Sequence, residues 1–253
     1  MTAAETSKPD WKVSLLLVAL MIAAVVMLGA ALIQRGAWYD PALLPEMATT
    51  PVTLSTGAKL YVQKYEVSVA EWNTCHDKGA CTLRLRVRPD QDARLTPATG
   101  LSYVDVGEFL DWINAATGMT FRLPTVSEWT EMAASVLPEE ADPIFTDPSL
   151  TWASTYLTEG LTPRALKPQG SFSTSPEGVA DLDGSVWEWT QECFSGASGE
   201  SDPARCPAFY VGGEHVAAMS YLIRDPARGG CAVGSPPAHL GMRLVTEKAI
   251  GEL

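Results

Sequence analysis

Histidine is scarce in this sequence, and closely spaced cysteine pairs are absent. The 253 residues include three histidines and five cysteines, and no two cysteines are arranged as Cys-x-x-Cys. Structural zinc sites commonly use such pairs, so the sequence does not indicate one. It also lacks a Gly-x-Gly-x-x-Gly fingerprint, a P-loop and a repeat of fixed period, which argues against dinucleotide binding, nucleotide binding and solenoid folds.

Positive charge is in short supply as well. Eighteen Lys and Arg residues stand against thirty Asp and Glu residues, which gives a formal net charge of −12. Only three of the basic and two of the acidic residues lie before residue 36, so the remainder of the chain carries −13. An acidic body repels the phosphate backbone, and we therefore expect no binding to nucleic acid.

One long hydrophobic run is present near the N-terminus. From Val13 to Ile33 the chain has twenty-one residues without a charge, which is enough to span a hydrocarbon core of about 30 Å. Trp11 precedes the run, and Trp38 and Tyr39 follow it, as is typical of aromatic anchors at membrane interfaces. The run predicts a single membrane anchor in the lipid bilayer, with a cleaved signal peptide as the alternative.

The charges around this run predict its orientation and the division of the chain. Lys8 and Lys12 precede the run and Arg35 alone follows it, which favours a cytoplasmic N-terminus. We expect a cytoplasmic segment 1–12, a transmembrane helix 13–35, a proline-bearing linker 36–51 and a domain 52–253 outside the cytoplasm. In a bacterial cell this domain lies in the periplasm, on the outer face of the inner membrane.

The cysteines fit an oxidising compartment. Cys75 and Cys81 are six residues apart, and Cys193 and Cys206 flank a loop rich in Gly, Ser and Asp. Both spacings predict local disulfide bonds, which leaves Cys231 without a partner. Reduced, buried cysteines are the alternative.

Two local patterns stand out within the domain. Capping boxes predict helix starts at 68–71 and 125–128, and Ser102 as an N-cap predicts a third at 102–105. In Trp187-Glu188-Trp189, a strand would place the two tryptophans on one face and the glutamate on the other. Residues 82–100 show no period and indicate a loop, and the long stretch 137–177 has no strong period either.

Four blocks in this order resemble the formylglycine-generating enzyme family, also called the sulfatase-modifying factor domain. They are Tyr65-Glu-Val-Ser68, Arg122-Leu-Pro-Thr125 with Glu128-Trp129, Asp183-Gly-Ser-Val-Trp-Glu-Trp189, and Arg228-Gly-Gly230 followed by Gly241-Met-Arg243. The resemblance covers residues 52–245. It implies an α+β, C-type-lectin-like fold with much irregular structure, here preceded by one transmembrane helix.

The resemblance also implies where catalysis would take place. Oxidases of this family bind copper through two cysteines shortly after the Arg-Gly-Gly block, and thiolates suit Cu(I). Here Cys231 follows Gly230 directly and no second cysteine comes after it. We therefore expect a non-catalytic member, a pseudoenzyme. Two metal sites remain as alternatives, namely an iron triad of His76, His215 and His239, and a copper pair of Cys231 and His239 assisted by His215.

Calcium is the one cofactor that the resemblance suggests. Relatives bind it near the block that corresponds to residues 183–189, through carbonyl, Asn and Glu oxygens. Glu188 is retained, Ser185 replaces the Asn, and Asp183 lies nearby, so these three are the candidate ligands. The alternative is that Glu188 belongs to a buried hydrogen-bond network.

The expected function is that of a non-catalytic, membrane-anchored periplasmic accessory or assembly subunit of a larger inner-membrane complex, for example an electron-transport complex. Partners would be contacted through the span and through the domain, and the basic loop bearing Arg84, Arg86, Arg88 and Arg94 is the candidate contact, unless it is only a solvated loop. A divergent metal-dependent oxidase or maturation factor that acts on a secreted protein is the alternative function. A sugar-binding role has no Glu-Pro-Asn or Gln-Pro-Asp signature in its favour.

Overall fold

A computed structural model describes residues 18, 20–23, 25, 40–137, 165–194, 206–226 and 238–250. The predicted interface aromatics Trp11, Trp38 and Tyr39, most of the predicted span 13–35, and Cys231 lie outside these residues. In the described part of the chain, no helix is both long enough and apolar enough to cross a membrane.

Three helices begin where the sequence predicts them, two at the capping boxes and one at the N-cap residue Ser102. They are α2 (Val69–Asp77), α3 (Tyr103–Thr117) and α4 (Val126–Ala133). In each, the N-cap hydroxyl accepts the backbone N–H three residues on, and the acidic residue at that position accepts the N-cap N–H in return. Such a cap stabilises a helix by about 1 kcal/mol. Gly118 ends α3 in the left-handed conformation, with φ 66°.

The strands form two small sheets. One has the order β1-β2-β7, from β1 (Val52–Thr53), β2 (Lys59–Val62) and β7 (Val245–Thr246). The other has the order β5-β4-β3-β6, from β5 (Ala217–Ser220), β4 (Ala208–Gly212), β3 (Val186–Cys193) and β6 (His239–Gly241). Among the strand pairs of the described residues, only β3 and β6 run parallel. Together with the helices, these sheets give the α+β class that the family resemblance implies.

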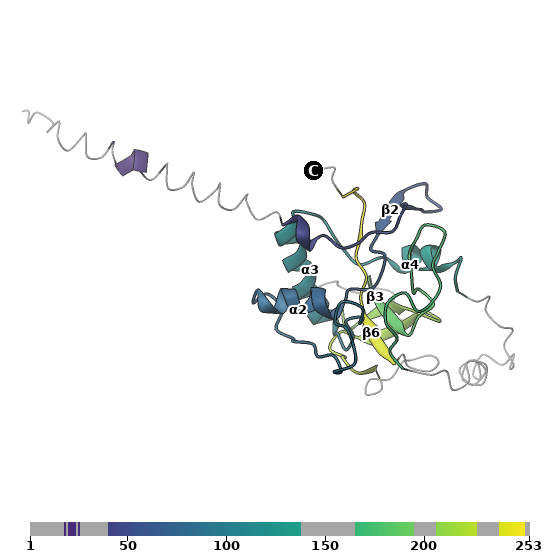
Figure 1. Cartoon of the computed structure of the whole chain (residues 1–253). Helices are drawn as coiled ribbons and strands as arrows, with labels where there is room; N and C mark the ends of the chain where they lie inside the picture. Colours follow the sequence, from purple (N-terminus) through teal and green to yellow (C-terminus); the bar gives the residue numbers. More distant parts are fainter. Residues whose placement is uncertain are drawn as a thin grey trace, which may run out of the picture.

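Helices α2 and α3 lie on one side of β3 and α4 on the other (Figure 1), and residues of these helices belong to two different hydrophobic clusters. Trp187 and Trp189 pack into the cluster that contains residues of α2 and α3. Glu188 points to the other face, where it accepts a hydrogen bond from Trp129 of α4. The alternation predicted for these three residues is confirmed, and it places a carboxylate against the second cluster.

The prediction that residues 36–51 form a linker is wrong from residue 40 onward. A short 3-10 helix, η1 (Pro41–Leu43), packs beside α3, and the Asp40 N–H donates to the carbonyl of Ala116 at 3.0 Å. Met47 forms a bridge with Gln63 next to β2. The prolines here shape an ordered segment of the domain, because the neighbouring Leu and Met side chains are apolar enough to pack against its core.

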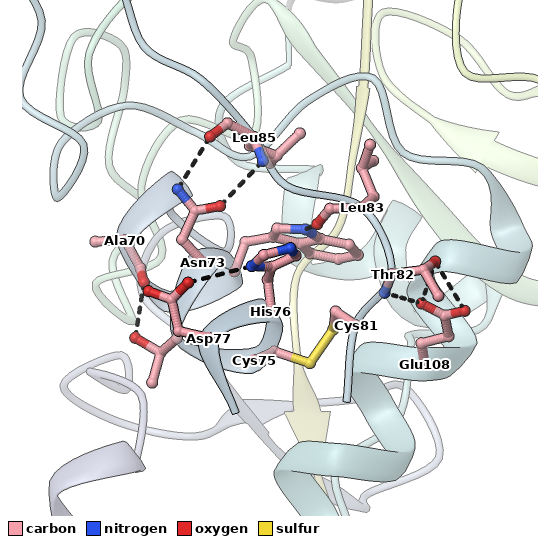
Figure 2. The surroundings of a disulfide bond; sticks show 12 residues. Ala70, Asn73, Cys75, His76, Asp77, Cys81, Thr82, Leu83, Leu85 and Glu108 are labelled. Carbon is pink, nitrogen blue, oxygen red and sulfur yellow. Dashed lines mark hydrogen bonds and ion pairs between the residues drawn. A yellow bond between two sulfur atoms is a disulfide. The ribbon is translucent and has the colours of Figure 1, made fainter. Parts of the chain in front are cut away.

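Both predicted disulfide bonds are confirmed. Cys75 and Cys81 are joined with a Cα–Cα distance of 5.3 Å, and Cys193 and Cys206 with one of 5.8 Å. These distances lie in the usual range for a disulfide. The first bond ties the end of α2 to the segment that follows it (Figure 2).

Candidate functional site

A fully buried arginine lies between the two sheets. Arg243 is 0% exposed and stands on the segment that leads from β6 to β7. Its Nη2 donates to Glu188 Oε1 at 2.8 Å, and its Nε donates to the same oxygen at 3.0 Å. The remaining donors reach three backbone carbonyls, those of Gln63, Lys64 and Ala180. A planar guanidinium suits this position because it satisfies many acceptors at once.

Glu188 is the principal counter-charge of Arg243. Its side chain is buried, and it also accepts a hydrogen bond from Trp129 Nε1 at 3.0 Å. The predicted calcium ligand Asp183 is engaged elsewhere, by the backbone N–H and hydroxyl of Ser173. Among the described residues no group of three or more His, Cys, Asp or Glu side chains is placed to hold a metal ion. The geometry of Glu188 matches the alternative, a buried hydrogen-bond network.

A second carboxyl group, Glu66, lies close to the same arginine. It is 2% exposed, and its Oε2 lies 3.9 Å from Arg243 Nη2. That separation is an ion-pair distance but too long for a hydrogen bond, and no described group donates to this oxygen. Burial raises the pKa of Glu66 to about 8, although Arg243 opposes the shift; Glu188 and Asp181 add to it. Burial thus favours the protonated form of Glu66.

Glu66 also lines a pocket of about 250 Å³. Other residues in its wall are Glu46, Gln63, Tyr65, Glu71 and Arg94. No pattern in the sequence predicts this pocket, because Glu66 stands out only as one residue of the Tyr-Glu-Val-Ser block. One weak signal indicates that Glu66 is buried. It lies in a strand-like run and is followed directly by an apolar residue.

The predicted basic loop contains a regular exposed edge. Arg84, Arg86 and Arg88 are exposed and alternate with half-buried Leu83, Leu85 and Val87. The expectation that 82–100 has no period is therefore wrong for this stretch, which has the two-residue period of an extended chain. We call Arg84, Arg86 and Arg88 the arginine ridge.

Helices α2 and α3 hold the ridge in place (Figure 2). The Trp72 indole donates to the carbonyl of Leu83 at 2.8 Å, and the side-chain amide of Asn73 both donates to and accepts from the backbone of Leu85. Thr82 binds Glu108 of α3 through its backbone N–H at 2.7 Å. The backbone is thus fixed, while the arginine side chains extend to solvent.

The ion pairs of the predicted contact residues are all at the surface. Arg84 pairs with Asp77, Arg88 lies 3.9 Å from Asp90, and Arg94 pairs with Asp92 within its own turn at 2.9 Å. Within the described chain, no ion pair involves Arg86. Arg94 stands apart from the ridge and lines the pocket beside Glu66.

The three histidines do not meet. His76 lies at the end of α2 and contacts Asp77 at 3.1 Å, whereas the His215 ring packs edge-on against Trp187 at 4.5 Å. His239 pairs with Val186 in the parallel ladder. Val186 and Trp187 face opposite sides of the sheet, so His239 and His215 do too. The described residues therefore give no support to a three-histidine site.

Comparisons with known proteins agree with this architecture. A family model described as "Sulfatase-modifying factor enzyme 1-like domain" matches residues 22–248. The crystal structure of CarF is 15% identical, with a TM-score of 0.50, and the match covers 82% of this chain and all of CarF. At such identity the similarity shows the fold alone.

Two further solved structures match over similar lengths. PvdO from Pseudomonas aeruginosa is 16% identical with a TM-score of 0.44, covering 80% of this chain and 92% of PvdO. Treponema denticola variable protein 1 is 13% identical with a TM-score of 0.46, covering 80% of this chain and 91% of that protein. No curated protein sequence matches the chain.

Proposed function

Because the chain belongs to the family of sulfatase-modifying factor enzyme 1-like domains, we propose that it is a non-catalytic, membrane-tethered member of that family. Its domain lies on the periplasmic side of a bacterial inner membrane. There it serves as an accessory or assembly subunit of a larger membrane complex. The arginine ridge is the surface through which the domain contacts its partner.

The pairing of the cysteines carries the non-catalytic assignment. Four of the five cysteines form the two disulfide bonds, so Cys231 is the one thiol that remains. A copper centre of the kind that the family resemblance implies needs two thiolates from the chain. One thiol cannot supply it, and Cys231 has no second cysteine after it in the sequence.

Tethering is supported by the sequence and by the disulfides. The uncharged run from Val13 to Ile33 has the length of a membrane span. Disulfide bonds persist in oxidising compartments such as the bacterial periplasm and are rare in the cytosol. With the basic residues before the run, these features favour a single span that places the domain outside the cytoplasm.

The arginine ridge is a strong candidate for recognition because of its setting. It concentrates positive charge on a protein whose residues from 36 onward carry −13. Complementary charge steers association and selects partners more than it adds affinity. Arginine is also enriched at the centres of protein interfaces. The expected partner surface is acidic.

Co-purification from membranes in mild detergent tests the proposal. The variant R84E/R86E/R88E reverses the ridge, and K59E/K167E/K248E makes the same change of charge at three exposed lysines elsewhere. We expect the partner to be recovered with the wild-type chain and with the lysine variant, and to be lost with the ridge variant. Deleting residues 13–35 should release the domain from the membrane. Equal recovery with all variants would contradict the proposal.

A divergent oxidase is the second candidate, favoured by the position of Cys231 directly after the Arg-Gly-Gly block. Metal content discriminates it from the first. The full chain, purified in detergent, is assayed for copper and iron beside its Cys231→Ser variant. Stoichiometric metal that disappears in the variant would establish the oxidase and overturn the non-catalytic proposal.

A further inference from the structure

Side chains of α2 occupy one backbone edge of the segment that carries the arginine ridge. The side-chain amide of Asn73 donates to the carbonyl of Leu85 at 3.1 Å and accepts from its N–H at 3.0 Å. The Trp72 indole donates to the carbonyl of Leu83 at 2.8 Å. Figure 2 shows both bonds of Asn73 reaching Leu85 from the same side. The amide of Asn73 thus takes the place of a residue in a neighbouring strand.

The opposite edge of this segment has no partner within the described chain. In an extended chain the backbone groups of successive residues point to opposite edges, so those of Arg84 and Arg86 point away from Asn73. Among the described residues, no hydrogen bond involves the backbone N–H or carbonyl of either arginine. Both residues are exposed, and water therefore binds these groups. The segment presents the unpaired groups of an edge strand.

The following turn limits the length of this open edge. Arg88 bonds Gln91 through both its backbone N–H and its carbonyl, and Pro89 beside it has no N–H. The open groups are therefore those of Arg84 and Arg86. The ridge from Arg84 to Arg88 spans about 13 Å at roughly 3.3 Å per residue, which suits one short added strand.

The two faces of the segment determine which side chains an added strand should carry. Leu83 and Leu85 pack against the hydrophobic cluster that contains Trp72, whereas the arginines are on the solvent side. An added strand would continue both faces. Opposite charges directly across a strand pair are stabilising, so acidic side chains fit beside the arginines. The matching sequence has an acidic residue at every second position and apolar residues between them.

The arginines also exclude one competing occupant. If two copies of this edge paired with each other, arginine would stand opposite arginine, and like charges in that position are destabilising. Charged side chains protect natural sheet edges from indiscriminate pairing. Here they repel another basic edge and attract an acidic one, which selects a partner by charge. The occupant that fits is therefore a different polypeptide.

We propose that the arginine ridge binds an extended acidic segment of the partner protein as an added antiparallel strand. The inference rests on the proposed function, in which the ridge contacts an acidic partner, and it specifies how the contact is made. Arg84 and Arg86 each exchange backbone hydrogen bonds with the acidic residue directly opposite. Main-chain bonds supply affinity in this mode of recognition and side chains supply specificity. Asn73 is a positioning residue that holds the edge extended.

Fluorescence anisotropy with the full chain in detergent tests strand addition. The probe is the dye-labelled peptide Gly-Glu-Val-Glu-Val-Glu-Gly, at low ionic strength. A peptide with the same composition in block order, Gly-Glu-Glu-Glu-Val-Val-Gly, has the same charge without the alternation. Two further peptides keep the alternating sequence and carry N-methyl groups, one on the amides of the last two glutamates and the other on those of the two valines.

We expect the alternating peptide and its valine-methylated form to bind, because the valine amides lie on the edge that faces away. The glutamate-methylated form lacks two donors to the ridge. Each backbone hydrogen bond is worth about twofold to tenfold in affinity, so its binding should be weaker by about fivefold or more. The block-ordered peptide should be weakened to a similar extent.

Two variants separate the edge from its charge. R84E/R86E/R88E should abolish binding of the alternating peptide. Asn73→Ala keeps every charge but releases the edge from α2, and should weaken binding by about threefold or more, as loss of one or two hydrogen bonds predicts. Asn114→Ala removes the same pair of bonds to the backbone of Phe121, away from the ridge, and should leave binding unchanged. Unfolding midpoints verify that each variant is folded, and the peptide series decides if Asn73→Ala is not.

Hydrogen–deuterium exchange resolved to single amides gives a direct readout. In the unbound chain the N–H of Leu85 should exchange slowly and those of Arg84 and Arg86 rapidly. The alternating peptide should slow exchange at both arginines. Absence of this protection at saturating peptide would overturn the proposal.

The outcomes distinguish this inference from the proposed function. Equal binding by the two methylated peptides, or by the block-ordered and alternating peptides, would overturn strand addition and leave the ridge as a charged contact surface. Absence of binding by every acidic peptide would also overturn strand addition. Equal binding of the alternating peptide by the wild type and R84E/R86E/R88E would contradict the role of the ridge itself.

Discussion

The chain holds arginines in two contrasting places, the buried site of Arg243 and the exposed ridge. Arg243 is 0% exposed, whereas the side chains of Arg84 and Arg88 are 56% and 71% exposed. All three lie beside carboxylates. Breaking a buried pair leaves an uncompensated charge and costs about 3–5 kcal/mol, whereas an exposed pair contributes about 0–1 kcal/mol. The buried arginine thus stabilises the fold, whereas the exposed ones contribute little to stability.

Replacing Arg243 should have the largest effect on stability. Arg243→Met keeps much of the volume but removes the charge that compensates Glu188 and the donors to three carbonyls. We expect the free energy of unfolding in urea to fall by about 3–5 kcal/mol. The matched change Arg86→Met should alter it by less than about 0.5 kcal/mol. Similar losses of stability in the two variants would contradict the distinction between the buried and the exposed arginines.

The free energy of unfolding should depend on pH because Glu66 titrates at a different pH in the folded and the unfolded chain. The folded-state pKa of about 8 lies above the ordinary value of 4.5, so between these values the folded chain binds more protons than the unfolded chain. The contribution of Glu66 to stability is fully present below pH 4.5 and is lost as pH rises through 8. The loss is at most about 1.4 kcal/mol per pH unit.

Urea unfolding curves across this range, for wild type and Glu66→Gln, measure that dependence. The downward slope with rising pH should flatten in the variant, because an amide does not titrate. An unchanged slope would show that another group is responsible.

Removing the disulfide beneath the ridge should have an intermediate effect. Cys75 and Cys81 close a short loop, with a sequence separation of 6. The chain-entropy estimate for the double change to serine is a loss of about 2 kcal/mol. Thermal unfolding under non-reducing conditions measures it. A change near zero would mean that Asn73 and Glu108 hold the ridge segment without help from the covalent bond.

Calcium removal should have the smallest effect on stability. Glu188 already accepts hydrogen bonds from Arg243 and Trp129, so it offers little to a further cation. We expect the unfolding temperature to be the same in EDTA and in calcium. If calcium raises the unfolding temperature of the wild type but not that of Asp183→Asn, the calcium site predicted from the sequence would be supported.

Features that depend on neighbouring residues could be predicted from the sequence. The capping boxes, the alternation around Glu188 and both short-range disulfides are of this kind. The sequence does not predict β4 and β5, or that β6 and β7 belong to two different sheets, because strand pairing joins distant segments.

The candidate sites were harder to predict, for two different reasons. Arg243, Glu188 and Glu66 come from three separate blocks, and only the folded chain brings them together. The arginine ridge is local, and its alternation of Leu and Arg was available in the sequence. This alternation is a weak signal, because the inward-facing positions are only half-buried and the segment does not form a strand.

Partner recovery by the ridge variant tests the central proposal most directly. The full chain and R84E/R86E/R88E are purified side by side from membranes, and the co-purifying protein is quantified by mass spectrometry relative to the chain. We expect the ridge variant to retain the unfolding midpoint of the wild type and to lose the partner, while K59E/K167E/K248E keeps it. Full recovery of the partner by a folded ridge variant would contradict the assignment of this surface to recognition.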